Sequence, residues 1–418
     1  MRRLLMIAIL YCGLLTWGCD KTCECTYSPS PTEPSDEASI VVTGPDSTVT
    51  AWRGHPLRIT WTSANVVGSV KILYSRNDGD TWPFTIIEST INEGEFFWTG
   101  DAPLTRHCRV RIQTTGSPLA YGESPSSFTL QTYGWTIDGP ASLFTVRATA
   151  TNGVDLFAVG SGGSINQRFA ATGEWSDRNS GTTRGLNDVH FVDQQVGWIC
   201  GGNGVIRRTT NGGVTWSSIP SVNTIEVRAI HGFDSMTAMA ASNMLWHTAN
   251  AGASWDTVAG MDTAIVNRLF FHDSQRACAV GNNGFIAISE DGGETWAVRN
   301  SHLFATLVDV HSADGQTYYA VALEGQVVKS EDRGETWRVL DLDNAPALSS
   351  VRSRSALELL VATGDSRLLH SIDGGDTWVY YNVGSEHYFN TLLIEPTGDG
   401  WVGGSGNVLY RLGIVDSE

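Results

Sequence analysis

Short apolar runs alternate with turn-forming residues along most of this chain. The runs recur in groups with the same internal order, and glycine, asparagine and aspartate separate them. In one group the runs LNDVHF, VGWICGG and VIRRTT cover 186–191, 196–202 and 205–210, and equivalent groups begin near residues 144, 225, 265, 306, 348 and 389. Apolar runs of this length between turn signals are typical of β-strands, so the pattern predicts an all-β chain.

Tryptophans mark the period of these groups. Seven of them lie 39 to 41 residues apart, at Trp135, Trp175, Trp216, Trp255, Trp296, Trp337 and Trp378. A repeat of about forty residues filled by short strands is the signature of a β-propeller, in which each repeat forms one blade of about four strands. Seven inner-strand starts therefore predict a seven-bladed propeller over residues 133–414.

The two ends of the repeat array complement each other. The group that begins at Phe389 has three strand patterns and no tryptophan after them, whereas Trp135 has no inner strands before it. We therefore expect residues 133–138 to supply the outer strand of the last blade, which leaves 415–418 as a tail. Closing the ring with this N-terminal strand removes the open sheet edges at which other chains could pair.

Five of the turns that precede a tryptophan share one plan. Each has Ser or Thr, then Asp or Asn two residues on, Gly two further on, and Trp last. Asp or Asn in such a turn accepts hydrogen bonds from backbone amides ahead of it, and Gly supplies a positive φ. We expect a structural, turn-capping role for these residues rather than a catalytic one. They are Asn211, Asn250, Asp291, Asp332 and Asp373, with Trp216, Trp255, Trp296, Trp337 and Trp378 after them.

These turns resemble the Asp-box (BNR) repeat. The wider pattern of Gly-Trp, GxxG and Asp box, clearest over Gly197–Trp216, resembles the photosystem II stability and assembly factor family across roughly residues 133–414. This resemblance implies a propeller that serves in assembly. The same fold also occurs in carbohydrate enzymes and in other envelope proteins, so it does not by itself fix an activity.

A different pattern occupies residues 39–132. Alternation in LRITWTS and CRVRIQT, broken by Gly, Pro, Asn and Asp, predicts a small antiparallel β-sandwich. The order of strands around Trp52, Trp61 and Trp98 resembles the immunoglobulin-like domain at the start of yeast cell-wall synthesis and Ser/Thr-rich anchored proteins. One turn of Asp-box form, Ser75–Trp82, also lies here. We expect no functional site in this domain.

The N-terminal segment carries a targeting signal. In residues 1–18, Arg2 and Arg3 precede an apolar stretch that is too short to span a bilayer comfortably, as in a secretory signal peptide. The run that ends at Cys19 resembles a bacterial lipobox, which implies a lipid on that cysteine; an ordinary signal peptide cut elsewhere is the alternative. Residues 19–38 predict a flexible tether. Its Cys23 and Cys25 have no assigned role.

The charge balance limits the kinds of molecule that the protein is expected to bind. The 418 residues hold 27 Lys and Arg against 44 Asp and Glu, a formal net charge of −17. Nucleic acid and anionic lipid head groups repel such a chain. The balance agrees with a body held at the bacterial cell envelope by its lipid anchor alone, facing the periplasm or on the cell surface.

Charged residues are expected where the central channel of the propeller opens. Counting back from each tryptophan aligns Arg147, Asp188, Arg228, Arg268 and Asp309, with Ser350 and Thr391 completing the ring. Three Arg and two Asp at one level are more charge than a buried wall normally carries. In one hypothesis the arginines bind an acidic or C-terminal group of a partner. In the other, Asp188 and Asp309 neutralise the neighbouring arginines.

No motif indicates a metal, a cofactor or a catalytic nucleophile. The inner-strand histidines lie at unequal distances from their tryptophans, so no single histidine ring is expected, and HxxxH and HxH spacings do not occur. These histidines are His190, His231, His272 and His311.

Two classes of function remain. The first is a non-enzymatic envelope scaffold that binds a protein. The second is a glycan-binding or sialidase-like glycoside-hydrolase protein, since sialidases and xyloglucan hydrolases also carry Asp boxes, with Asp188 and Asp309 as its carboxyl pair. Sialidases of this type have an Arg-Ile-Pro motif, which the sequence lacks, and the xyloglucan enzymes use two propellers where this chain has room for one. We therefore expect a scaffold and not an enzyme.

Overall fold

The computed structural model describes residues 37–415, apart from 141–143, 223–224, 262–263, 341, 343, 384–386 and 396–398. In this part of the chain the regular structure is almost entirely β, which confirms the expected all-β class. The helices found there are single 3-10 turns: η1 (Ser161–Gly163), η2 (Gly202–Gly204), η3 (Asn282–Gly284) and η4 (Ser405–Asn407). No helix of these residues is long and apolar enough to cross a membrane. The expected signal peptide and Cys19, Cys23 and Cys25 lie outside the described residues.

Two sheets form the N-terminal domain. One has the order β1 (Ser39–Gly44), β3 (Leu57–Ala64) and β6 (Glu95–Trp98). The other contains β2 (Thr50–Trp52), β4 (Ser69–Ser75), β5 (Phe84–Ile91), β7 (Thr105–Thr114), β8 (Tyr121–Glu123) and β9 (Phe128–Ile137). Alternate residues of both sheets meet in one core, where Ile59, Ile72 and Ile112 are fully buried. The alternation of apolar and polar positions therefore gives each sheet one buried face.

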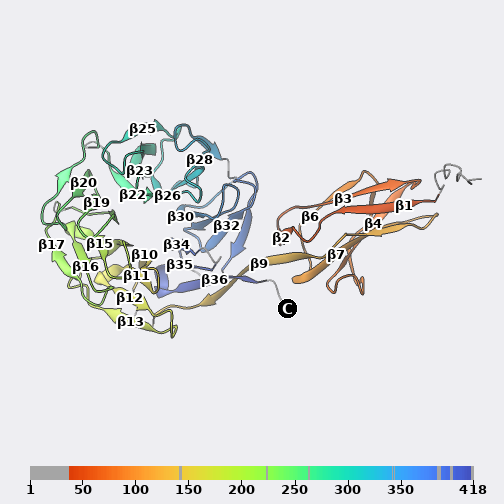
Figure 1. The fold of residues 1–418 in the computed structure, drawn as a ribbon, viewed down its shortest axis with the longest axis horizontal. Coiled ribbons are helices and arrows are strands. Elements are labelled where there is room, and N and C mark those ends of the chain that lie inside the picture. Colours follow the sequence, from red (N-terminus) through yellow and green to blue (C-terminus); the bar gives the residue numbers. More distant parts are fainter. Residues whose placement is uncertain are drawn as a thin grey trace, which may run out of the picture.

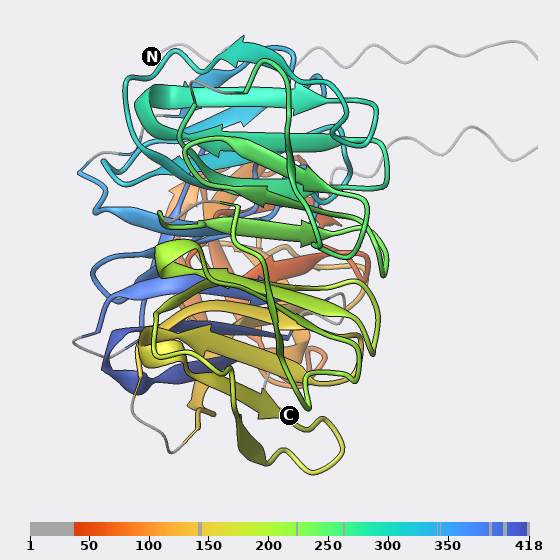
Figure 2. The same ribbon diagram turned by 90° about the vertical axis from the view of Figure 1, so that its left-hand side faces the viewer.

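Four-stranded antiparallel sheets, which we call blades, form the rest of the molecule and lie around a ring (Figure 1). The first and second blades are β10 (Val146–Thr151), β11 (Leu156–Gly160), β12 (Ile165–Arg168) and β13 (Trp175–Arg178), then β14 (Leu186–Phe191), β15 (Gly197–Gly201), β16 (Ile206–Thr209) and β17 (Ser217–Ile219). The third and fourth are β18 (Ala229–Gly232), β19 (Ala238–Ala241), β20 (Leu245–Thr248) and β21 (Asp256–Thr257), then β22 (Val266–Phe271), β23 (Ala277–Gly281), β24 (Phe285–Ser289) and β25 (Ala297–Asn300). The fifth and sixth are β26 (Leu307–His311), β27 (Tyr318–Ala322), β28 (Val327–Ser330) and β29 (Arg338–Leu340), then β30 (Leu348–Ser353), β31 (Leu359–Thr363), β32 (Arg367–Ser371) and β33 (Val379–Asn382). Figure 2 shows the ring edge-on, with strands running across the thickness of the disc.

The last blade uses a strand from the N-terminal domain. Its own strands are β34 (Phe389–Ile394), β35 (Gly400–Gly404) and β36 (Leu409–Val415), and β9 pairs antiparallel with β36 from Tyr410 opposite Ile137 to Val415 opposite Thr132. The same β9 pairs with β7 further back along the chain. The boundary expected between residues 132 and 133 therefore falls inside one continuous strand, which belongs to both parts of the molecule.

Side chains also join the two parts. Trp52 of β2 stacks on Tyr133 at 4.8 Å between ring centroids and lies in the apolar cluster of the last blades. Beside it, His55 Nε2 lies 3.1 Å from His370 Nδ1, and both histidines are buried. The N-terminal domain and the propeller consequently share a packed interface as well as a strand.

The Asp-box turns hold their shape by hydrogen bonds within each turn. In the turn before Trp296, Ser289 Oγ donates to Asp291 Oδ1 at 2.8 Å and accepts the Gly293 amide at 2.8 Å. Asp291 Oδ1 in turn accepts the Thr295 amide at 2.9 Å. The turns at Asn211, Asn250, Asp332 and Asp373 repeat this arrangement. A buried hydroxyl and a turn-start acceptor thus satisfy the backbone amides of each reversal.

Candidate functional site: the channel mouth

The site begins with a β-bulge in the inner strand of the blades. The register of the inner strand against the second strand shifts by one residue at the same place in six of them, for example between Val266 and Arg268. A bulge sets two residues opposite one, so strict alternation of faces is lost there. As a result neighbours such as Asn267 and Arg268, or Ser349 and Ser350, line the same cavity.

This cavity is the channel mouth, with a volume of about 490 Å³. Its lining is polar and mixed in charge. The residues are Arg147, Asn187, Glu226, Arg228, Asn267, Arg268, Asn282, Thr306, Val308, Asp309, Leu323, Ser349, Ser350, Asn390 and Thr391. Four of the five charged residues expected at the mouth are therefore there, and Asp188 lies on the inner side of them, in a second cavity.

The structure places the expected ring at two levels rather than one. Asp188, Arg268 and Asp309 pair with equivalent residues of their second strands, Cys200, Val280 and Val321. At that level the first and third blades carry Ala148 and Ala229. Arg147 and Arg228 precede these alanines and belong to an outer level with Asn187, Asn267, Val308, Ser349 and Asn390. In these two blades fewer residues separate the inner strand from the tryptophan, because the connections between strands are shorter. A count back from the tryptophan therefore reaches the arginine that precedes the equivalent alanine.

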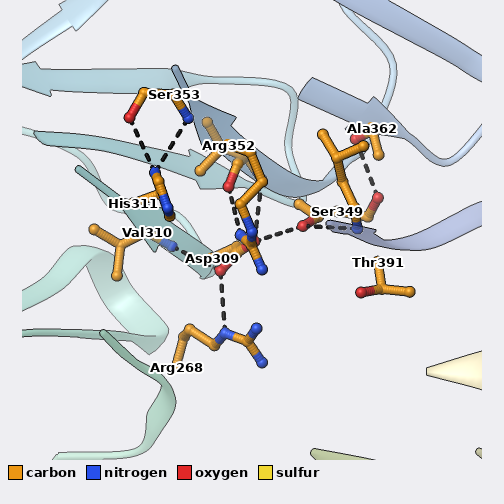
Figure 3. Close-up of polar contacts among 12 residues, drawn as sticks. Arg268, Asp309, Val310, His311, Ser349, Arg352, Ser353, Ala362 and Thr391 are labelled. Atoms are coloured by element: carbon orange, nitrogen blue, oxygen red, sulfur yellow. Dashed lines mark hydrogen bonds and ion pairs between the residues drawn. The ribbon is translucent and has the colours of Figure 1, made fainter. Parts of the chain in front are cut away.

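The inner level forms a cluster of ion pairs between buried carboxylates and partly buried arginines, which we call the channel ion cluster: Asp188, Arg268, Asp309 and Arg352. Arg268 donates to Asp188 Oδ1 at 2.9 Å and lies 3.1 Å from Asp309 Oδ1. Arg352 donates to Asp309 Oδ2 at 2.7 Å, so Asp309 lies between two guanidinium groups (Figure 3). The neutralisation expected between Asp309 and Arg268 is present, but Asp188 also pairs with Arg268, not with Arg147 or Arg228.

Burial and charge set the protonation of the two carboxyls in opposite directions. Burial raises the pKa of Asp188, although Arg268 and the Ile230 amide oppose that shift. Burial would raise the pKa of Asp309 as well, but Arg352, Arg268, Ser350 and the Val351 amide together hold it below its usual value. Asp309 is therefore ionised and matched by its arginines.

The outer level is held by asparagine side chains. Asn187 donates to the Val227 carbonyl at 2.9 Å, Asn267 to the Leu307 carbonyl at 2.8 Å, and Asn390 to the Val146 carbonyl at 2.8 Å. Each bond joins one blade to the next, and the last joins the final blade to the first. These asparagines were not expected from the sequence, although Asn187 and Asn267 lie two blade repeats apart. Arg352 was not expected either, although it follows Ser350 by two residues on the same face of a strand.

Both outer arginines donate to an asparagine, and Arg228 also has a carboxylate nearby. Arg147 is exposed and donates to Asn187 Oδ1 at 2.7 Å, while Arg228 donates to Asn267 Oδ1 at 2.6 Å. The nearest carboxylate to Arg228 is that of half-exposed Glu226, at 3.7 Å. Because an asparagine orients a guanidinium without cancelling its charge, the mouth presents two positioned cations.

The histidines differ from the sequence expectation. His190, His231 and His311 pair with Trp198, Met239 and Tyr319, which are equivalent residues of their second strands, so these three share one level of the channel. His272 lies outside the inner strands. Among the described residues no group of three or more His, Cys, Asp or Glu side chains has the geometry to hold a metal ion.

Comparison with known proteins places the fold among BNR-type β-propellers. The model of a family described as photosynthesis system II assembly factor YCF48 (PSII_BNR) matches residues 167–265. No curated protein matches the sequence.

Comparison with solved structures also indicates a β-propeller. The chain is similar to a structure described as YCF48 bound to D1 peptide, with 21% identity over 67% of this chain and 96% of that one and a TM-score of 0.57. YCF48 from Cyanidioschyzon merolae is 15% identical over 66% and 98%, with a TM-score of 0.57. A streptogramin B lyase is 10% identical over 68% and 98%, with a TM-score of 0.59. These likenesses confirm a YCF48-like propeller fold, which proteins of different function share.

Proposed function

We propose that this protein is a non-enzymatic scaffold whose channel mouth binds an acidic segment or C-terminal carboxylate of a partner protein. The observation that carries the proposal is the pair of outer arginines, Arg147 and Arg228, which asparagines orient beside a cavity of about 490 Å³. Planar guanidinium groups fixed in this way suit bidentate recognition of a carboxylate. The similarity to a YCF48 structure with a bound peptide supports a peptide ligand.

The proposal also includes the architecture of the protein and its attachment to the cell envelope. The blades make a seven-bladed ring that presents a rigid disc, and the N-terminal domain is an immunoglobulin-like spacer. A lipid on Cys19 tethers the protein to the bacterial cell envelope. The glycosidase alternative needs one carboxyl free to donate a proton and another free to assist attack. It is less favoured because Asp188 and Asp309 both bind Arg268.

Crosslinking in intact cells tests the proposal. The protein is expected to trap a specific envelope protein, and the double change Arg147→Gln and Arg228→Gln should weaken that capture at least tenfold, since each charge-assisted bond contributes about 1.5–3 kcal/mol. Arg338→Gln on the outer strand β29 is the matched control and should leave capture unchanged. The same captured proteins at the same yield from the double variant would exclude the mouth as the binding site.

A further inference from the structure

A second cavity lies in the channel on the inner side of the channel ion cluster. Its volume is about 210 Å³, and we call it the channel chamber. Polar lining comes from Asp188, Arg268 and Arg352, together with the imidazoles of His190, His231 and His311. Apolar residues such as Ile230, Leu269, Phe270 and Leu393 complete the wall. Arg268 lines both this chamber and the mouth, so the ion cluster separates the two cavities.

Backbone contacts fix which imidazole nitrogen carries the proton. His190 Nδ1 accepts the Gly232 amide at 3.1 Å, and His311 Nδ1 accepts the Ser353 amide at 3.2 Å (Figure 3). Each bond comes from the next blade, where it ties neighbouring inner strands together. A nitrogen that accepts an amide cannot hold a proton, so the neutral ring carries its hydrogen on Nε2. Among the described residues, no protein hydrogen bond engages Nε2 of either histidine.

The acceptors beside these donors are already engaged. Asp188 accepts Arg268 and the Ile230 amide, and Asp309 accepts Arg268, Arg352, Ser350 and the Val351 amide. The chamber therefore contains imidazole and guanidinium N–H groups beside carboxylates whose oxygens each already accept a bond from the protein. Donors in a partly enclosed site of this kind are stabilised by an acceptor that enters from outside.

We propose that the channel chamber binds a small inorganic oxyanion of the phosphate or sulfate type. Such an anion supplies several acceptor oxygens to the imidazole and guanidinium N–H groups that converge on the chamber. Organic ligand pockets usually span about 300–1,000 Å³, so a chamber of 210 Å³ suits an ion rather than an organic ligand. Burial lowers the pKa of His190 to about 4 and that of His311 to about 3, which keeps both rings as neutral donors at pH 7.

Titration calorimetry of the full chain with sodium sulfate and with sodium phosphate tests this site. Both anions are expected to bind with one site per chain. Sulfate, which has acceptors only, should bind no more weakly than phosphate because the chamber is rich in donors. His311→Asn keeps an amide oxygen near the Nδ1 position for the Ser353 amide but removes the distal N–H. It should weaken binding about tenfold, as expected for one lost bond to a charged group.

Two controls separate this site from others. His247→Asn on β20 replaces a histidine outside the channel lining and should leave sulfate affinity unchanged. The double variant Arg147→Gln and Arg228→Gln should also bind sulfate normally, because the ion cluster divides the mouth from the chamber. Absence of saturable heat with the unaltered chain would overturn the proposal, since the chamber would then hold water only. Loss of binding in the mouth variant, or unchanged binding in a His311→Asn protein with an unaltered melting temperature, would also overturn it.

Discussion

Arg268 and Arg147 show that arginines of the same channel can have different roles. Arg268 bridges two buried carboxylates, Asp188 and Asp309, whereas Arg147 lies exposed with a neutral partner. Both come from inner strands of the same ring and differ by one level along the channel. Pairing with two buried carboxylates gives Arg268 a role in stability, while exposure and a neutral partner leave the charge of Arg147 available to a ligand.

This contrast predicts that matched substitutions of the two arginines change the free energy of unfolding by very different amounts. Arg268→Met leaves Asp188 without its arginine and Asp309 with only Arg352, so we expect a loss of about 3–5 kcal/mol of unfolding free energy. Arg147→Met should change it by less than about 0.5 kcal/mol. Urea denaturation of the two variants measures both values. Similar stability for the two proteins would show that the ion cluster does not hold the channel together.

The Asp-box turn is the smallest repeated element on which the ring depends. A buried serine or threonine hydroxyl accepts the amide of a glycine four residues on, where a positive φ such as the +92° of Gly293 bars most other residues. In three copies, those at Trp296, Trp337 and Trp378, the indole also donates to the carbonyl of that glycine. The same hydroxyl and amide bonds recur at Ser75 and Asn77 in the N-terminal domain, where the turn also ends in a tryptophan.

Removing one hydroxyl from such a turn should be measurable. Ser289→Ala leaves the buried Gly293 amide without its acceptor, at an expected cost of about 1–3 kcal/mol. Ser217→Ala, in an exposed position of β17, is the matched control and should be neutral. The denaturant midpoint of each protein gives the comparison. A neutral Ser289→Ala would mean that the turn is held by its aspartate alone.

The two parts of the molecule are joined by β9 and by a buried histidine pair. His55 and His370 are at most 1% exposed and contact each other, with Glu358 Oε1 3.5 Å from His370 Nε2. Burial and the neighbouring His370 lower the pKa of His55 to about 4, and burial lowers that of His370 despite Glu358. Both rings are therefore neutral at pH 7 in the folded protein, with Asp373 and Arg354 the other charged groups near them.

Acid pH should consequently lower the free energy of unfolding. The unfolded chain takes up a proton on His55 near pH 6.5, whereas the folded protein takes it up only near pH 4. The stability that neutral His55 contributes is therefore complete above pH 6.5 and falls as the pH drops toward 4, by about 1–3 kcal/mol. The lowered pKa of His370 acts in the same direction. Denaturant titrations from pH 7.5 to 4.5 should show this slope, and His55→Phe should reduce it. His107→Gln, at an exposed site, should keep the original slope.

Much of the architecture could be predicted because it depends on local patterns. LNDVHF at Leu186–Phe191 forms β14 and SIVVTG at Ser39–Gly44 forms β1, since alternating apolar residues bounded by turn signals leave few other conformations. The Asp-box plan likewise placed each turn. Charged residues of the channel could be found, but their levels could not, because shorter connections between strands in the first and third blades shift the count from the tryptophan by one residue.

The strands, their period and the turns follow from local sequence, because they depend on neighbours within a few residues and on a repeat that every blade obeys. The packing of the folded chain sets which arginines are neutralised, which imidazole nitrogens accept backbone amides, and how β9 pairs with both β7 and β36. Those outcomes depend on residues brought together from distant parts of the chain, such as His55 of the N-terminal domain and His370 of β32, which are 315 positions apart. Burial and charge pairing act on distances in space, and only the closed ring sets those distances.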